Sequence, residues 1–191
     1  MTRDDRLAGL VLAGGRSSRF GAEKAVQVLN GRTLLEIALS TLHEVSGPLA
    51  VSAAQGSEAE ALAISLGYPV VIDDPAFPRG PLTGIAAGLA WAADAGADFL
   101  VTLPCDTPLV DGEVLRTLET GGFAETEAGP QSLIAVWPVG ALGWLNDTLA
   151  QGEHPPVHAA LVRCGVRAVR FDSLGQFANV NTLQDLKNLS P

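Results

Sequence analysis

The sequence is poor in cysteine and in positive charge, and each shortage excludes a class of protein. Its 191 residues include two cysteines, Cys105 and Cys164, too few for a disulfide framework or a four-cysteine zinc site. Twelve Lys and Arg residues stand against 21 Asp and Glu residues, which gives a formal net charge of −9. Because non-specific affinity for nucleic acids and anionic membranes comes from neutralising phosphates, we expect neither as a partner.

Long hydrophobic runs are also absent. The apolar run at residues 7–13 ends at two glycines and is not followed by a signal-peptide cleavage pattern, and no later run reaches about 18 apolar residues without a charge or a breaker. We therefore expect a soluble cytoplasmic protein with reduced thiols. The length predicts one domain over residues 1–191.

Short apolar runs alternate with helical patterns over the first 120 residues. The predicted strands are 7–13, 49–53, 68–72 and 98–103. The predicted helices are 34–45, 57–66, 84–95 and 111–120, the first of them beginning at a capping box from Thr33 to Glu36. This alternation predicts an α/β fold with a mostly parallel, Rossmann-like sheet and helices on both faces.

Beyond residue 120 the pattern is weaker. It favours strands at 132–137 and 166–171 and helices at 142–150, 157–164 and 183–189, the last capped by Thr182. Residues 121–129 are expected to form a surface loop or an edge hairpin. Since ligands of such sheets bind at the carboxyl ends of the strands, the loops 14–24, 73–84 and 104–108 should meet there.

The first of these loops combines paired glycines with cations. Gly14 and Gly15 leave backbone N–H groups open, and Arg16, Arg19 and Lys24 follow within nine residues. This combination suits a polyphosphate, although a glycine-rich turn with surface cations is the plainer alternative. The spacing excludes both the G-x-G-x-x-G fingerprint and the Walker A motif.

The other two loops and a late segment carry acids and amides. Asp106 lies just beyond the predicted strand 98–103, where a carboxylate suits Mg²⁺ together with substrate phosphates, or else caps a turn. Asp73 and Asp74 precede a helix that is expected near Gly84 and offers free N–H groups, unless the loop is only a rigid proline-rich connection. Asn179 and Asn181 offer donors and acceptors to a polar ligand, although, taken alone, a turn is the better interpretation of them.

Two other groups of residues are not expected to act in chemistry. His154 and His158 have the i, i+4 spacing of a helical zinc site, but Pro155 and Pro156 between them break such a helix. Cys105 has no histidine near it in sequence, which favours packing over a nucleophilic role.

At these residues the sequence resembles a known family. Residues 12–15 with Arg19, Gly21 and Lys24 resemble the signature loop of nucleotidyltransferases with a nucleotide-diphospho-sugar transferase fold, a three-layer sandwich, and residues 103–108 resemble that family's metal-binding Asp segment. With the ending at residues 179–182, the set is most similar to the molybdenum cofactor guanylyltransferases. That resemblance implies transfer of GMP from GTP to molybdopterin with release of pyrophosphate, and molybdoenzyme apoproteins or other cofactor-biosynthesis proteins as further partners.

The resemblance also implies roles for individual residues. Arg19 and Lys24 would hold phosphates, Asp106 would bind Mg²⁺, and these three would carry catalysis, whereas Asn179 and Asn181 would contact the pterin. The nucleotide would lie against Leu12, Ala13, Gly14, Gly15, Lys24, Ser52, Asp74 and Asp106.

Three positions depart from the family pattern. Ser52 stands where an Asn is common, Glu23 where the loop usually has Asp, and Gln131-Ser132 where a His-Pro pair is frequent. The alternatives are a cytidylyltransferase, an NTP transferase for another phosphorylated acceptor, or a non-catalytic carrier of molybdopterin.

Overall fold

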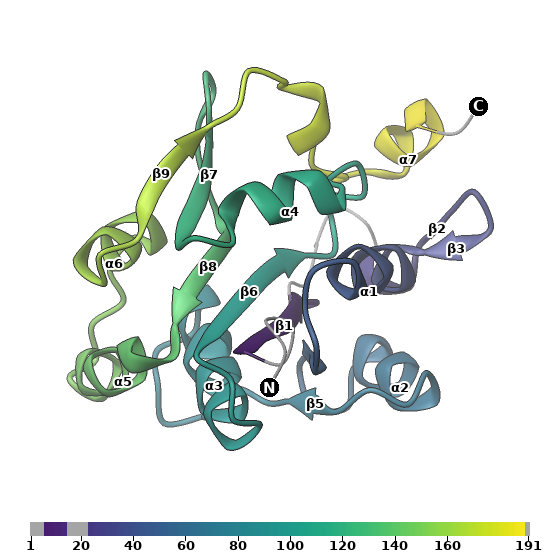
Figure 1. The fold of residues 1–191 in the computed structure, drawn as a ribbon. Helices are drawn as coiled ribbons and strands as arrows, with labels where there is room; N and C mark the ends of the chain where they lie inside the picture. The colour runs from purple at the N-terminus through teal and green to yellow at the C-terminus, as the bar shows by residue number, and fades with distance from the viewer. Residues whose placement is uncertain (1–5, 15–22, 190–191) are drawn as a thin grey trace.

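We describe residues 6–14 and 23–189 of a computed structural model, in which one sheet organises the chain (Figure 1). Its strands are β1 (Leu7–Leu12), β4 (Leu49–Ser52), β5 (Val70–Val71), β6 (Phe99–Pro104), β7 (Gly122–Thr126), β8 (Gly129–Pro138) and β9 (Arg167–Arg170). They lie in the order β5-β4-β1-β6-β8-β7-β9. Neighbours from β5 to β6 are parallel, β8 runs antiparallel to β6 and β7, and β9 is parallel to β7, which confirms the mostly parallel sheet.

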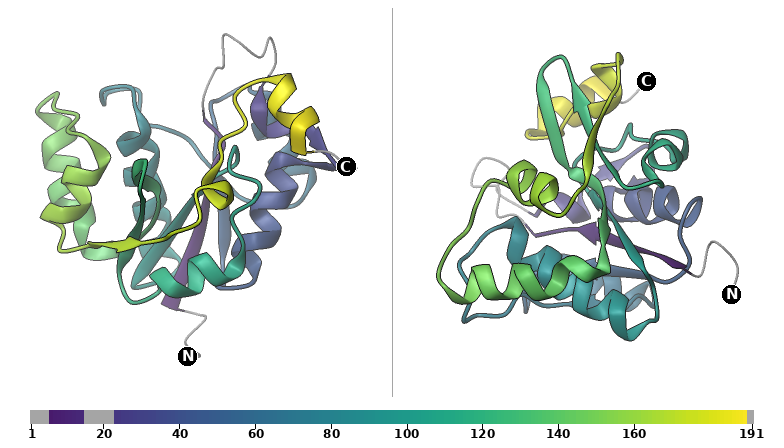
Figure 2. Two further views of the ribbon diagram at one scale, coloured as in Figure 1. Left: turned by 90° about the horizontal axis from the view of Figure 1, so that it is seen from above. Right: turned by 60° about the vertical axis from the view of Figure 1, so that its left-hand side comes forward.

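Helices cover both faces of this sheet. The first face carries α1 (Leu34–His43), α2 (Glu58–Ser65) and α4 (Gly112–Leu118), and the second carries α3 (Pro81–Asp94), α5 (Leu142–Ala150) and α6 (Val157–Arg163). Figure 2 shows the two helix layers with the sheet between them. The predicted three-layer sandwich is confirmed.

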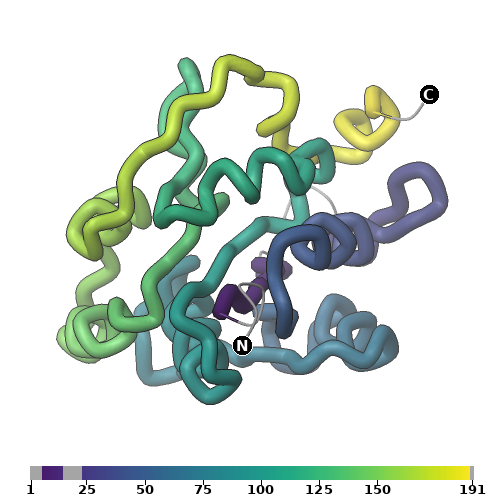
Figure 3. The backbone as a smooth tube through the Cα atoms, viewed as in Figure 1, coloured from purple at the N-terminus to yellow at the C-terminus, as the bar shows by residue number. Residues whose placement is uncertain are grey.

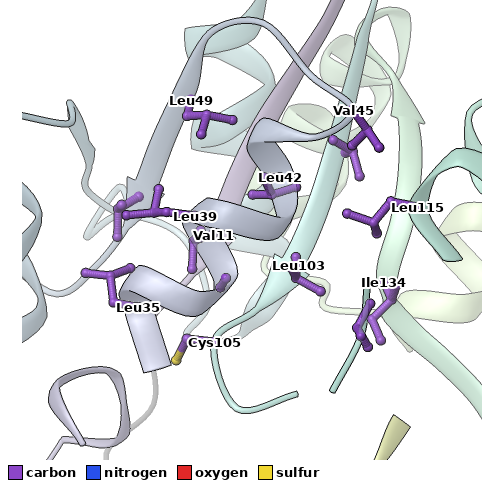
Figure 4. Close-up of a cluster of buried hydrophobic side chains, with 14 of the residues drawn as sticks. Val11, Leu35, Leu39, Leu42, Val45, Leu49, Leu103, Cys105, Leu115 and Ile134 are labelled. Atoms are coloured by element: carbon purple, nitrogen blue, oxygen red, sulfur yellow. The ribbon is translucent and has the colours of Figure 1, made fainter. Parts of the chain in front are cut away.

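Side chains of β1 alternate between two buried clusters, as expected for a strand covered on both faces. Val11 packs with helices of the first layer, while Leu10 and Leu12 pack with the second. In the first cluster, Leu39 and Leu42 of α1 lie over Val11 (Figure 4).

The start of α1 is fixed by the predicted capping box. The Thr33 hydroxyl accepts a hydrogen bond from the Glu36 amide at 3.2 Å, and the Glu36 carboxylate accepts from the Thr33 amide at 2.8 Å. Hydrogen bonds from the Thr33 side chain and backbone hold the pKa of Glu36 below its usual value. The stabilisation that these bonds give is fully present at pH values above the pKa that Glu36 has in the unfolded chain. It is lost as the pH falls through the lower pKa that Glu36 has in the folded protein.

Two predicted features of the fold are wrong in position. β7 does form a hairpin with β8, but residues 121–129 do not lie at the edge, because β7 is inside the sheet, between β8 and β9. The residues of β7 are mostly buried, as expected for an interior strand. β9 forms the edge of the sheet on that side, and its exposed arginines are typical of an edge strand. The helix expected near Gly84 begins at Pro81, a residue favoured in the first helical position.

The last segment of the chain returns to the N-terminal half of the molecule. Figure 3 follows it from β9 across the fold to α7 (Leu183–Leu189). Val180 and Leu186 pack against Leu34 of α1 and against Leu29 in the hairpin of β2 (Val28–Leu29) and β3 (Arg32–Thr33). The return brings residues 179–181 to the end of β6. No helix of the described residues is long and apolar enough to cross a membrane.

Candidate active site

Four strand ends meet at one edge of the sheet. Leu12 of β1 lies in register with Ser52 of β4 on one side and with Pro104 of β6 on the other. Because β8 is antiparallel to β6, its first residues reach this same edge. A cavity of about 460 Å³ opens here, and its lining includes Pro81, Asp106, Gln131, Ser132, Asn179 and Asn181.

A lysine from the first loop lies between an acid and an amide at this edge. Lys24 Nζ donates to Asp106 Oδ2 at 2.8 Å and to Asn181 Oδ1 at 2.7 Å. The Lys24 and Asp106 side chains are 17% and 23% exposed, so this ion pair is better shielded from water than a surface pair. The contact confirms that the loops after β1 and β6 meet.

Backbone hydrogen bonds hold the acid and the amide together. Val180 N donates to the carbonyl oxygen of Asp106 at 2.7 Å. The Asp185 carboxylate accepts from the amides of Asn181 and Thr182, each at 2.8 Å, and these bonds, that of Asn181 first, keep the pKa of Asp185 below its ordinary value. Residues 179–182 are therefore fixed to α7 on one side and to the Asp106 loop on the other.

The backbone at Lys24 is anchored by its neighbour. Lys24 opens a short 3₁₀ turn, Lys24–Val26, in which Ala25 is buried. The Glu23 carboxylate accepts from the amide of Ala59 at 2.9 Å, in the first turn of α2, where a negative charge is favourable. This bond connects the end of the first loop to a helix of the scaffold.

Comparison with known proteins identifies the family of this chain. The family model of the MobA-like NTP transferase domain matches residues 9–137. The chain is 40% identical over 187 residues to a molybdenum cofactor guanylyltransferase of Cereibacter sphaeroides, covering 95% of this chain and 94% of that protein. The enzyme of the same name from Acidiphilium cryptum is 36% identical over 183 residues, covering 94% and 92%.

The chain belongs to the MobA-like NTP transferase family. It is a nucleotidyltransferase, as the resemblance at residues 12–24 and 103–108 implies. The fold agrees with the crystal structure of molybdopterin-guanine dinucleotide biosynthesis protein A from Archaeoglobus fulgidus, with a TM-score of 0.74, 24% identity and 96% coverage of both chains.

The signature loop of this nucleotidyltransferase is described only in part. Gly15, Arg16 and Arg19 lie outside the described residues, so their predicted roles remain predictions. At the end of β1, the Leu12 carbonyl accepts from Cys105 N at 3.2 Å, and Ala13 N donates to the Ser52 carbonyl at 2.9 Å. Among the described residues other than its neighbours in the chain, none has an atom within 4 Å of a Cβ built on Gly14.

The two acids after β5 have different surroundings. Asp74 Oδ1 accepts from Ala76 N at 2.9 Å and closes a turn. A Cβ built on Gly84 would lie 2.7 Å from Ser52 Oγ and 3.2 Å from Asp73 Oδ1, so Asp73 lies beside Ser52 at the strand ends. The Asp73 carboxyl is partly buried, and this partial removal from solvent raises its pKa. Asp74 as a nucleotide contact remains a prediction.

The N-terminus of α3 is capped by a histidine that no local sequence pattern indicated. The Leu82 amide donates to His154 Nε2 at 3.3 Å, and Thr83 N donates to the Gly80 carbonyl. This corrects the expectation of free N–H groups on that helix.

Cys105 has the packing role expected of it. Its side chain is buried in the first cluster, and burial raises the pKa of its thiol to about 12, so it stays protonated at neutral pH. It therefore supplies no thiolate nucleophile beside Asp106.

The protein ligands available to a metal are few. Among the described residues, no group of three or more His, Cys, Asp or Glu side chains is arranged to hold an ion. With Asp106 as its protein ligand, a metal ion would have most of its coordination positions filled by substrate oxygens and water. That fits Mg²⁺, which is commonly bound by one or two carboxylates together with substrate phosphates.

Proposed function

We propose that this protein transfers GMP from GTP to the terminal phosphate of molybdopterin, forming molybdopterin guanine dinucleotide and pyrophosphate in one domain. The observation that carries the proposal is the contact between Lys24 and Asp106 across two strand ends. The named activity of relatives at 36–40% identity over nearly the whole chain supports the choice of substrates.

The nucleotide is assigned to the edge between β1 and β4. Gly14 supports this assignment because no other described part of the chain covers its backbone, and Ser52 supports it because it lies beside Asp73 at the strand ends. Leu12, Ala13, Gly15 and Asp74 complete the proposed nucleotide site. Lys24 and Arg19 would neutralise the phosphates.

The acceptor is assigned to the cavity. Its volume of about 460 Å³ lies within the range typical of small-molecule sites. Asn179 and Asn181 supply amides to its lining, and Pro81 and Leu133 supply apolar surface, a combination that suits a pterin ring. Asp106 lines the same cavity, so the acceptor would bind beside the proposed catalytic acid.

The reaction needs positioning and neutralisation of charge more than proton transfer. An oxygen of the acceptor phosphate attacks the α-phosphorus of GTP, and the bond from that phosphorus to the β-phosphate oxygen breaks, so pyrophosphate leaves. The attacking phosphate is already anionic at neutral pH, so no strong base is required. Lys24 and Arg19 offset negative charge at the phosphates. Asp106 would hold Mg²⁺, which supplies further positive charge at the α-phosphate and the leaving group.

Pyrophosphate release from a mixture of GTP, Mg²⁺ and molybdopterin tests the proposal. We expect release that depends on all three components and a product that contains guanine and pterin in equal amounts. Faster release with CTP would indicate a cytidylyltransferase. Binding of molybdopterin without pyrophosphate release would indicate a carrier and contradict the proposed function.

Glu23 provides a test of how Lys24 is positioned. Glu23→Ala removes the bond to Ala59 N, which anchors the backbone next to Lys24. We expect GTP binding to weaken by about 1 kcal/mol, the typical contribution of one hydrogen bond, which corresponds to a rise in the KM for GTP of about fivefold. The KM for molybdopterin should not change. Steady-state kinetics with each substrate varied in turn would measure both constants.

Two variants control this experiment. Glu23→Gln keeps an oxygen that can accept from Ala59 N and should restore the KM for GTP. Ser57→Ala removes the α2 cap, in which Ser57 Oγ accepts from Glu60 N at 3.1 Å, without changing Glu23. An equal rise of the KM for GTP in Ser57→Ala would contradict a specific role of Glu23.

A further inference from the structure

The N-terminus of α3 receives its cap from a distant part of the chain. Its N-cap residue is Gly80, which has no side chain to accept from the first amides of the helix. His154, 72 residues from Leu82, provides the missing acceptor, because its Nε2 accepts from Leu82 N at 3.3 Å.

Gly80 and His154 fit together closely. A Cβ on Gly80 would overlap the imidazole ring of His154, so a larger residue would displace the ring. Gly80 also has φ 156° and ψ 174°, a conformation that is almost confined to glycine. The backbone at the start of α3 is thus shaped to accept this ring.

The contact joins two walls of the acceptor cavity. Pro81 at the start of α3 and Val157 at the start of α6 both line the cavity. His154 precedes Val157 by three residues, and the intervening Pro155 and Pro156 have restricted backbone angles. The hydrogen bond from Leu82 to His154 therefore holds the α3 wall against the α6 wall.

We propose that His154 is a positioning residue that sets the width of the acceptor cavity. The proposal rests on the assignment of this cavity to molybdopterin. Because Nε2 accepts from a backbone N–H, it carries no proton, and the neutral ring has its proton on Nδ1. His154 acts on acceptor binding through Pro81 and Val157.

Kinetics with His154→Ala tests this role. Loss of one hydrogen bond that shapes the cavity should raise the KM for molybdopterin about tenfold, while kcat and the KM for GTP stay within about twofold. His154→Gln should restore the KM for molybdopterin, because its side-chain oxygen can accept from Leu82 N. His158→Ala, on an exposed position of α6, is the matched control and should leave all three constants unchanged.

Imidazole ¹⁵N spectra test the contact without relying on activity. The chain has three histidines, so the His154 signals can be assigned as those lost in His154→Gln. We expect the Nδ1–H tautomer of the neutral ring, and the Nε2–H tautomer would overturn the proposal. Unchanged KM for molybdopterin in His154→Ala, or a loss of kcat that His154→Gln does not restore, would overturn it as well. A wild-type protein that shows the Nδ1–H tautomer but releases no pyrophosphate would instead contradict the proposed function.

Discussion

Replacement of Asp106 by asparagine is expected to lower kcat for pyrophosphate release at least about 100-fold, as removal of one key electrostatic group does in other enzymes. Asparagine has nearly the same shape and can still accept from Lys24 Nζ, so the variant removes mainly the charge. The bond from Val180 N to the backbone carbonyl at this position is kept, and the loop should stay in place. The measurement is kcat at saturating GTP and molybdopterin over a range of Mg²⁺ concentrations.

Asp111 offers a matched control for the loss of one negative charge. It caps α4, where its Oδ1 accepts from Glu113 N and Val114 N, and Asp111→Asn keeps an oxygen able to do so. We expect kcat of this variant to stay within about twofold of wild type, as for most surface substitutions. If Asp106→Asn behaved in the same way, Asp106 would not be the residue that holds the metal.

The central part of the site could be predicted because it follows from strand direction. Lys24 and Asp106 are 82 residues apart in sequence, yet each comes after a parallel strand, β1 and β6 respectively, with no other strand between. Since the carboxyl ends of parallel strands share one edge, their meeting follows once the strands are recognised. The capping box at Thr33 was equally accessible, because both of its residues lie in one short segment.

Contacts made by late segments could not be predicted in this way. Asn181 reaches Lys24 across 157 residues and His154 reaches Leu82 across 72, and neither pair has a local pattern. The interior place of β7 likewise depends on its pairing with β9 after two intervening helices. Hydrophobic periodicity indicates that a strand exists and says little about its partners.

One missed element did have a local signal. Asn30 and Gly31 connect β2 to β3 with φ values of 51° and 82°, the positive angles of a two-residue hairpin turn for which Asn-Gly is the preferred sequence. The hairpin matters to the site because Leu29 packs with Val180, which lies between the two asparagines assigned to the acceptor. Its strands of two residues each were too short for an alternating pattern to show.

Replacement of Lys24 by methionine is expected to weaken GTP binding about 10- to 100-fold. Hydrogen bonds to charged groups contribute roughly 1.5–3 kcal/mol, and methionine keeps most of the side-chain length while removing Nζ. We expect the variant to change GTP affinity more than kcat, because Lys24 is the cation that the described residues place beside the proposed phosphate site. Equilibrium binding of GTP without acceptor measures it directly.

The chain contains a natural control for this variant. Its only other lysine is Lys187, which lies exposed in the last turn of α7. Lys187→Met changes the net charge by the same amount, and GTP affinity should stay within about twofold of wild type. Equal GTP affinity in Lys24→Met and wild type would exclude Lys24 from the nucleotide site.

Combining the two large-effect variants tests whether Lys24 and Asp106 act as one unit. Each holds the other in the described structure, since Nζ and Oδ2 are 2.8 Å apart, so removing either group also disturbs its partner. We therefore expect the loss of kcat/KM in the double variant to be smaller than the product of the two single losses. A double variant whose loss equals that product would mean that the two residues act independently, with the lysine binding phosphate and the acid acting elsewhere in the reaction.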